Sequence, residues 1–235
     1  MRMSARMVFA VALACSFVAL PARAQGRDEY DMGLMQMVLL RNVGWKPRPV
    51  SALDKVWRDH RARVQKLVES GKVALAGEVT DEGLLREILV FKTQSADEAR
   101  AVVEALPAVA AGALRPEYLK WFAARNYITP PRRPLAARPY VFGLLVRGPR
   151  WTPEVTEETK RLQAGHMDNI KRLSDAGKLV LAGPFDGGGD RRGVFIFKVD
   201  TLAEARALTD TDPAVSAGRL SVELYRWSVP EGMLR

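Results

Sequence analysis

Hydrophobic and polar positions follow the same order twice along the chain. An apolar run at 34–41, and another at 140–147, each predicts a β-strand. Each run is followed by apolar residues spaced three or four apart, which predicts an amphipathic helix of about twenty residues. The residues that share one face of these helices are His60, Val64, Leu67 and Val68 in the first, and His166, Ile170 and Leu173 in the second.

Two more strands, a second helix and a final strand complete each pattern. Gly71 and Gly177 follow the long helices and suit left-handed C-caps. Ser95 and Thr201 precede the second helices, and each can serve as an N-cap with a glutamate three residues later. The remaining strands are expected at 72–77, 86–93 and 114–122 in the first pattern, and at 178–183, 193–200 and 220–228 in the second.

The two patterns are also related residue by residue. A shift of 106 positions places His60 on His166 and aligns 60–121 with 166–227. More than twenty of these 62 residues are identical, where typical residue frequencies would give about four or five. The chain therefore contains an internal duplication.

The order strand–helix–strand–strand–helix–strand is typical of a ferredoxin-like unit, whose sheet is covered by helices on one face only. The bare face needs a partner, and the second copy can supply it. We therefore expect an α+β protein in which two ferredoxin-like βαββαβ repeats pack sheet to sheet as an intrachain pseudo-dimeric α+β barrel, in a monomer. Repeat 1 is expected at 33–124, a solvated Pro/Arg-rich linker at 125–139 and repeat 2 at 140–229.

The N-terminus has the pattern of a secretory signal peptide. Basic residues precede an apolar run of 13 residues, and an Ala-x-Ala sequence ends at Ala24. We expect cleavage after Ala24 and a periplasmic or secreted protein; a lipoprotein modified at Cys15 is the alternative. The apolar run is short for a membrane span, which needs about 20 residues. No transmembrane segment is expected in the mature chain.

Composition restricts the chemistry further. Loss of residues 1–24 removes the single cysteine and lowers the net charge from +9 to +6, with 33 basic and 27 acidic residues remaining. The basic residues are scattered, which together with export argues against a nucleic-acid partner. Two distant histidines without cysteine cannot supply a usual zinc site. Neither a metal nor a cofactor is expected.

Several short motifs carry a family resemblance. They are His166 on its helix, "AGKLVLAGPF" at 176–185, "EARAL" at 204–208 and "DTDPAVSAG" at 210–218. As a set they resemble the YCII-related family, and the first copy matches it more weakly. The likeness covers about 35–123 and 140–228. It implies a dimeric α+β barrel and a histidine–aspartate pair as the active site, in a family whose members mostly have no assigned function and of which some resemble lyases that act on small aromatic or lactone-like compounds.

His166 and Asp212 are the candidate catalytic residues. A histidine can act as general acid or base near neutral pH, and the aspartate could orient it. Each has a simpler alternative: His166 as a packed core histidine, and Asp212 as the N-cap of a short helix that begins at Pro213. The first copy has Leu106 where the second has Asp212. We therefore expect at most one working site, in repeat 2, and a degenerate site in repeat 1.

Other candidates are weaker. Arg147 and its counterpart Arg41 could bind a substrate carboxylate or simply end their strands in solvent. The glycine-rich stretch at 186–190 lies between two predicted strands, which favours a hairpin loop over a phosphate cradle. The tryptophans are repeated in both copies, which favours packing over ligand stacking: Trp45, Trp121, Trp151 and Trp227.

Two functions remain open. One is an exported small-molecule enzyme, lyase- or isomerase-like, that uses His166 with Asp212. The other is a non-catalytic small-molecule-binding or accessory module of the same fold. A cavity beside His166 and a bond to Asp212 would favour the enzyme.

Overall fold

Eight antiparallel strands close into one barrel in a computed structural model that describes residues 30–43, 50–133, 136–187 and 189–235. The strand order around the barrel is β1-β3-β2-β8-β5-β7-β6-β4. The expected α+β class with an α+β barrel is confirmed. The strands are β1 (Met32–Asn42), β2 (Leu75–Val79), β3 (Leu85–Phe91), β4 (Leu114–Ala124), β5 (Ala137–Arg147), β6 (Leu179–Asp186), β7 (Arg191–Phe197) and β8 (Leu220–Pro230).

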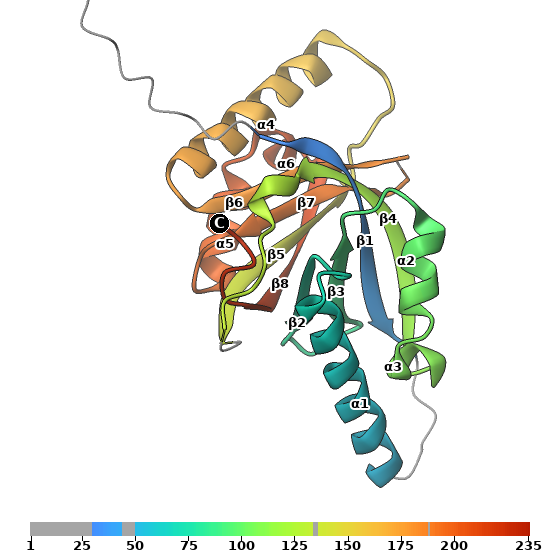
Figure 1. The fold of residues 1–235 in the computed structure, drawn as a ribbon. Helices are drawn as coiled ribbons and strands as arrows, with labels where there is room; N and C mark the ends of the chain where they lie inside the picture. Colours follow the sequence, from blue (N-terminus) through green and yellow to red (C-terminus); the bar gives the residue numbers. More distant parts are fainter. Residues whose placement is uncertain (1–29, 44–49, 134–135, 188) are drawn as a thin grey trace, which may run out of the picture.

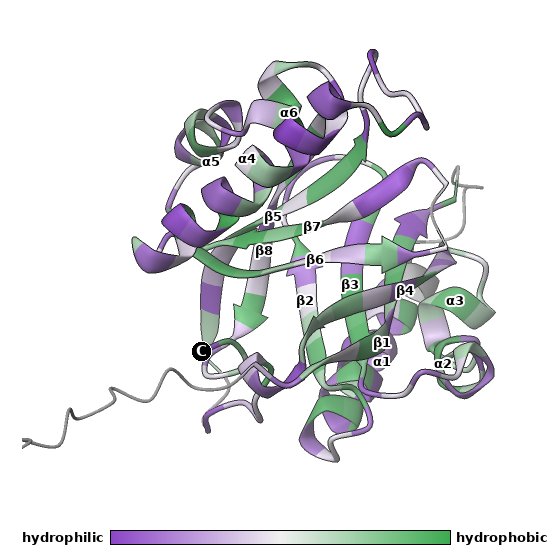
Figure 2. Ribbon diagram, turned by 90° about the horizontal axis from the view of Figure 1, so that it is seen from above, coloured by the Kyte–Doolittle hydropathy of each residue, from purple (hydrophilic) through white to green (hydrophobic). Residues whose placement is uncertain are grey.

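The helices cover the outside of the barrel on two opposite sides. Figure 1 shows the helices of the N-terminal half beside β1–β4, and Figure 2 shows those of the C-terminal half across the barrel from them. The N-terminal set is α1 (Val50–Glu69), α2 (Ala96–Val103), α3 (Pro107–Ala110) and the 3-10 turn η1 (Arg125–Tyr127); the C-terminal set is α4 (Glu157–Asp175), α5 (Leu202–Asp210) and α6 (Pro213–Ser216). None of the helices in the described part of the chain is long and apolar enough to span a bilayer.

The two halves of the barrel join at their edges. Strand β2 pairs with β8, and β4 pairs with β6. The predicted barrel therefore does not consist of two separate sheets packed face to face. The edge strands of the two halves hydrogen-bond to each other, so that one sheet closes on itself. Each of the eight described strands has a strand neighbour on both sides, although each junction is only two residue pairs long.

Glycines at corresponding places allow this closure. A Cβ atom on Gly77 would lie 2.4 Å from Nε1 of Trp227, and one on Gly183 would lie 2.0 Å from the carbonyl oxygen of Phe122. Trp121 donates a hydrogen bond from Nε1 to the Gly183 carbonyl at 3.1 Å. Each "AG" motif therefore sits where the other half's strand and tryptophan approach most closely.

The barrel interior combines an apolar core with a chain of charged side chains. Trp121 and Trp227 are buried, as expected for tryptophans that pack. Arg191 forms ion pairs with Glu117 of β4 and Glu223 of β8, although β7 neighbours neither strand, so these side chains meet across the interior. Glu223 also accepts a hydrogen bond from Tyr225; burial and this bond raise the pKa of Tyr225 to about 12.

The pairing register of β5 with β7 differs by one residue from the register that the 106-residue shift predicts from β1 and β3. Gln36 pairs with Phe91, whereas Val141, and not Phe142, pairs with the corresponding Phe197. Arg41 and Arg147 are therefore not equivalent, which corrects their alignment: a one-residue shift moves a strand residue to the other face. Arg41 is an ion-pair partner of Glu117 and not a solvated strand end, since its side chain is 20% exposed.

Local signals in the sequence are confirmed. Ser95 and Thr201 accept hydrogen bonds from the backbone N–H of Glu98 and Glu204, respectively. Gly71 and Gly177 have φ of 72° and 67°, as left-handed C-caps require. The glycine-rich stretch lies between β6 and β7, as a hairpin loop.

The expected linker is less solvated than its sequence indicates. Ile128 is buried and forms a β-bridge with Leu234 near the C-terminus, and Arg132 donates its backbone N–H to the Glu231 carbonyl. Strand β5 begins at Ala137, inside the expected linker. The C-terminal residues thus fix the connection between the halves.

Candidate functional site

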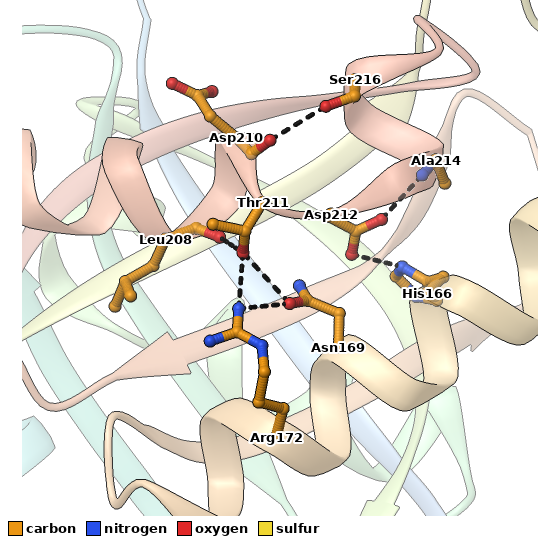
Figure 3. A network of polar contacts seen from close by, with 9 residues as sticks. All are labelled: His166, Asn169, Arg172, Leu208, Asp210, Thr211, Asp212, Ala214 and Ser216. Carbon is orange, nitrogen blue, oxygen red and sulfur yellow. Dashed lines mark hydrogen bonds and ion pairs between the residues drawn. The ribbon is translucent and has the colours of Figure 1, made fainter.

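His166 and Asp212 are brought together by helices α4 and α6. Nδ1 of His166 lies 2.7 Å from Oδ2 of Asp212, and both residues are buried (Figure 3). Asp212 is the N-cap of α6, and its Oδ1 accepts a hydrogen bond from the Ala214 N–H at 2.9 Å. The predicted capping role of Asp212 is confirmed, and the same carboxylate also holds the histidine.

The surroundings of Asp212 favour its charged form. Burial opposes ionisation, but the hydrogen bonds from His166 and the Ala214 N–H outweigh it and hold the pKa of Asp212 below its usual value. Asn169 points its amide nitrogen toward this carboxylate, while its oxygen accepts hydrogen bonds from Arg172 and Thr211 (Figure 3). The helix face that carries His166 is thereby tied to the turn before α6.

His166 also lines a pocket of about 690 Å³. Its ring stacks on Phe195 of β7, with the ring centroids 5.7 Å apart. Among the described residues, Nε2 of His166 has no hydrogen-bond partner. An ionised aspartate on Nδ1 requires the hydrogen there, so in the neutral imidazole Nε2 carries the lone pair and is the nitrogen available to a ligand.

The pocket draws on both halves of the chain. Its C-terminal part is mostly apolar, with Ile170, Leu181 and Val194 among the lining residues. The N-terminal half adds Tyr30, Met32, Phe122 and Ala124. Tyr30, Met32 and Phe122 are large apolar side chains left exposed at this site, together with Met167 of α4. No sequence signal identified these contributions, because they depend on the β4–β6 junction.

The first half holds its histidine differently. Nε2 of His60 lies 2.8 Å from Oε2 of Glu87 on β3, and Nδ1 accepts the backbone N–H of Ala108 at 3.3 Å. Both ring nitrogens are therefore occupied, with the hydrogen on Nε2. The first half has Leu106 where the shift of 106 positions places Asp212, but its histidine still has a carboxylate partner, which the sequence alone did not indicate. The signal was a glutamate inside the apolar strand of residues 85–91.

Glu87 differs from Asp212 in its ionisation. Burial raises the pKa of Glu87, and the hydrogen bond from His60 offsets only part of that effect. A smaller pocket of about 470 Å³ adjoins this pair, and it is lined mainly by charged residues. Leu106, at the N-cap position of α3, is buried and provides no side-chain cap.

Arg147 lies near the large pocket but is not one of its lining residues. It forms an ion pair with Asp190 at 3.5 Å and lies over the ring of Trp151. Trp151, Arg192 and Arg219 do line the pocket, and the sequence analysis named neither arginine as a candidate. Trp151 thus faces a cavity, contrary to the packing role expected of the four tryptophans; Trp45 lies outside the described residues.

Metal-ligating side chains do not gather anywhere in the described ranges. No group of three or more His, Cys, Asp and Glu residues suitable for a metal ion occurs there. The large pocket on α4 is lined by one imidazole, apolar side chains, two arginines and a further polar group made of Gln163, Lys171, Ser174 and Asp175.

Comparisons with known proteins agree with this fold. A heme-binding protein from Thermus thermophilus is similar at a TM-score of 0.54, with 16% identity over 84% of this chain and 91% of the other. A variant of chlorite dismutase from Candidatus Nitrospira defluvii has a TM-score of 0.55, with 11% identity over 86% of this chain and 92% of the other. No curated protein sequence matches the chain.

A family comparison covers the half that holds His166 and Asp212. Residues 146–228 match the sequence model of the YCII-related domain. This range includes α4, both helices that follow it and strands β6 and β7. The resemblance inferred from the short motifs is therefore confirmed for this part of the chain. Residues 146–228 thus resemble the YCII-related domain, and they lie within a closed, eight-stranded α+β barrel.

Proposed function

We propose that the protein is a small-molecule enzyme, lyase- or isomerase-like, in which His166 transfers a proton to or from a ligand in the large pocket. The observation that supports this most directly is the Nε2 of His166, which has no hydrogen-bond partner among the described residues and belongs to a pocket-lining histidine whose Nδ1 is held by Asp212. The volume of about 690 Å³ is within the range of small-molecule sites. The apolar lining suits an aromatic or similarly apolar compound.

The proposed chemistry is general acid–base catalysis. When Nε2 takes a proton, the imidazolium carries its charge beside the ionised Asp212, which lowers the free energy of that state. A positioned acid or base of this kind contributes about 10²–10⁴-fold to a rate. Lyases and isomerases commonly begin by removing a proton from carbon, which requires a base and a site that excludes bulk water.

Hydrogen exchange tests this proposal without knowledge of the net reaction. A thermal-shift screen of small aromatic and carboxylic compounds identifies compounds that bind. These are then incubated with the protein in D₂O, and mass spectrometry measures the deuterium that they incorporate. The proposal expects deuterium at a carbon position of at least one binder. His166→Gln should abolish the exchange and retain binding, whereas the matched variant His60→Gln should retain both.

The outcomes separate the two functions named above. Binding without exchange in the wild-type protein overturns the enzyme and supports a non-catalytic binding module. Exchange that survives in His166→Gln overturns the role of that histidine. The premise is checked by ¹⁵N NMR, which should find the two neutral imidazoles as opposite tautomers, with hydrogen on Nδ1 of His166 and on Nε2 of His60.

Heme binding is a second candidate, favoured by the name of the Thermus thermophilus relative and by the donor set. The Nδ1 of His166 bonds a carboxylate and its Nε2 has no partner among the described residues, as in histidines that hold a metal. His166 would hold the iron, and Arg192 and Arg219 could pair with the propionates. Bound heme would supply iron redox chemistry. Hemin titration should give a shifted Soret band that His166→Gln loses and His60→Gln keeps; an unchanged free-hemin spectrum overturns this candidate.

We also propose that the two halves are copies of one ferredoxin-like βαββαβ unit, bounded at about 33–124 and 140–229, and that the chain is a monomer with an internal pseudo-dimer. The support is that each half supplies four adjacent strands in corresponding order, β4-β1-β3-β2 and β8-β5-β7-β6. Size-exclusion chromatography with light scattering tests the monomer.

Export is proposed on the sequence of residues 1–24. N-terminal sequencing of protein recovered from a periplasmic fraction should begin at Gln25. An intact N-terminus, or modification at Cys15, would overturn cleavage after Ala24.

A further inference from the structure

Three arginines converge on one tryptophan at the edge of the pocket. The guanidinium carbons of Arg192 and Arg219 each lie 4.4 Å from the centre of the Trp151 ring, and that of Arg147 lies 5.2 Å away. They come from separate segments: the end of β5, the start of β7 and the residue before β8. Such contacts attract a cation to the ring face and here hold three like charges near one another.

The loop that carries Trp151 is fixed by its backbone. The N–H of Gly148 donates to the Arg219 carbonyl at 2.9 Å, and the N–H of Arg150 donates to the Gly218 carbonyl at 2.9 Å. A Cβ atom on Gly148 would lie 2.2 Å from the Gly218 oxygen, so only glycine allows this approach. Trp151 is therefore a preformed platform for the arginines, and their arrangement does not depend on a ligand.

Acidic side chains do not balance these charges. Asp190 pairs with Arg147 and is 84% exposed, whereas Arg192 and Arg219 form no ion pair with any described residue. Burial, and then the charges of Arg147 and Arg219, lower the pKa of Arg192. An anion bound here would relieve the repulsion between the guanidinium groups.

The surplus charge belongs to the same cavity as His166. Trp151, Arg192 and Arg219 line it at one part of its wall, and His166 lines it at another. The lining also includes apolar residues such as Leu145, Leu220 and Phe195. A ligand that satisfies both parts has an anionic group joined to an apolar body.

We propose that Arg192 and Arg219, with Arg147 behind them, form a recognition subsite for a carboxylate, and that the pocket takes apolar carboxylic acids. The proposal rests on the proposed function only in assigning the apolar part of the ligand to His166. Guanidinium groups match carboxylates as planar, two-pronged donors. Phosphate sites usually add free backbone N–H groups, but the N–H groups of Arg147, Gly148, Arg150 and Trp151 all donate to carbonyls here.

A matched set of probes tests the subsite. Calorimetry compares 2-naphthoate, 2-naphthamide and 2-naphthyl phosphate, which share one apolar body. The wild-type protein should bind 2-naphthoate at least about tenfold more tightly than the amide, as expected for a charge-assisted contact. Arg192→Gln and Arg219→Gln should each remove most of this preference. Arg161→Gln, an exposed arginine on α4 that loses the same charge, should keep it.

The controls separate this proposal from the proposed function. His166→Gln should keep the preference for the carboxylate. The subsite can therefore be tested even if His166 proves to have no catalytic role. Equal binding of acid and amide by the wild-type protein, or no binding of the acid, overturns the proposal even if an arginine variant fails to fold. Tighter binding of the phosphate overturns the assignment to a carboxylate. Arg219→Lys should weaken the acid less than Arg219→Gln but more than Arg161→Gln.

Discussion

His60 and His166 correspond under the shift of 106 positions, yet their ring nitrogens bond in the opposite sense. In His166, Nδ1 is hydrogen-bonded to Asp212, and Nε2 has no partner among the described residues. In His60, Nε2 is hydrogen-bonded to Glu87, and Nδ1 accepts a hydrogen bond from the backbone N–H of Ala108. Asp212 has a lowered pKa and Glu87 a raised one. Both halves therefore hold a buried histidine–carboxylate pair, and the two pairs differ in whether a ring nitrogen is left without a partner at a pocket.

One backbone N–H shows how this difference arises. In the second half the N–H of Ala214 donates to the capping oxygen of Asp212. In the first half Leu106 offers no oxygen, and the N–H of the corresponding Ala108 donates to the imidazole. A buried N–H must find an acceptor, so loss of the cap redirects the histidine. Conversely, Glu87 corresponds to Gly193, where an added Cβ would lie 2.6 Å from the Gly183 oxygen.

Leu106→Asp should have the largest effect on this comparison. It would place a second carboxylate beside His60, which already binds Glu87, in a fully buried position. We expect a loss of about 3–5 kcal/mol in the free energy of unfolding at pH 7, as for an uncompensated buried charge. Urea unfolding followed by circular dichroism measures it. Leu106→Asn should cost less, and Leu106→Asp combined with Glu87→Gln should recover part of the loss; equal stability of Leu106→Asp and the wild type would contradict the argument.

Asp212→Asn should have the next largest effect. It keeps an acceptor for the Ala214 N–H but turns an amide N–H toward His166, which favours hydrogen on Nε2, as in His60. Loss of the charged bond should cost about 2 kcal/mol at pH 7. Because the folded pKa of Asp212 is lowered, its contribution is present above its ordinary pKa of 3.8 and is lost as the pH falls. Denaturation at several pH values should show the two proteins converging in acid; a constant difference would refute the linkage.

Glu87→Gln should show the opposite pH dependence. The folded pKa of Glu87 is raised above 4.5, so the wild type is favoured below that pH and loses this contribution as the pH rises through the folded pKa. The glutamine keeps an acceptor for Nε2 of His60. The variant should therefore gain on the wild type by about 1 kcal/mol between pH 4.5 and neutrality. A variant that loses stability relative to the wild type as the pH rises would show that Glu87 is charged in the folded protein.

The sequence predicted the duplicated elements, caps and barrel because each rests on local spacing or on a match between copies. It paired His166 with Asp212 through the family resemblance. It missed Glu87 and the arginines on Trp151, because their partners lie on strands whose neighbours are set only when the barrel closes. It misaligned Arg147 with Arg41 because the apolar run of the strand looks the same after a one-residue offset. The offset nevertheless moves each side chain to the opposite face of the sheet.

The two junctions between the halves, β4–β6 and β2–β8, differ in a single hydrogen bond of a tryptophan, which gives the smallest expected effect. Trp121 donates from Nε1 to the Gly183 carbonyl, whereas Nε1 of Trp227 is buried beside Gly77 with no partner among the described residues. Trp121→Phe and Trp227→Phe remove the same atoms from matching places, so the loss of ring volume cancels in their difference. Trp121→Phe should then be less stable than Trp227→Phe by about 1 kcal/mol, the net value of one hydrogen bond. Equal unfolding free energies in urea would mean that the two junctions are energetically alike and that this hydrogen bond adds no net stability.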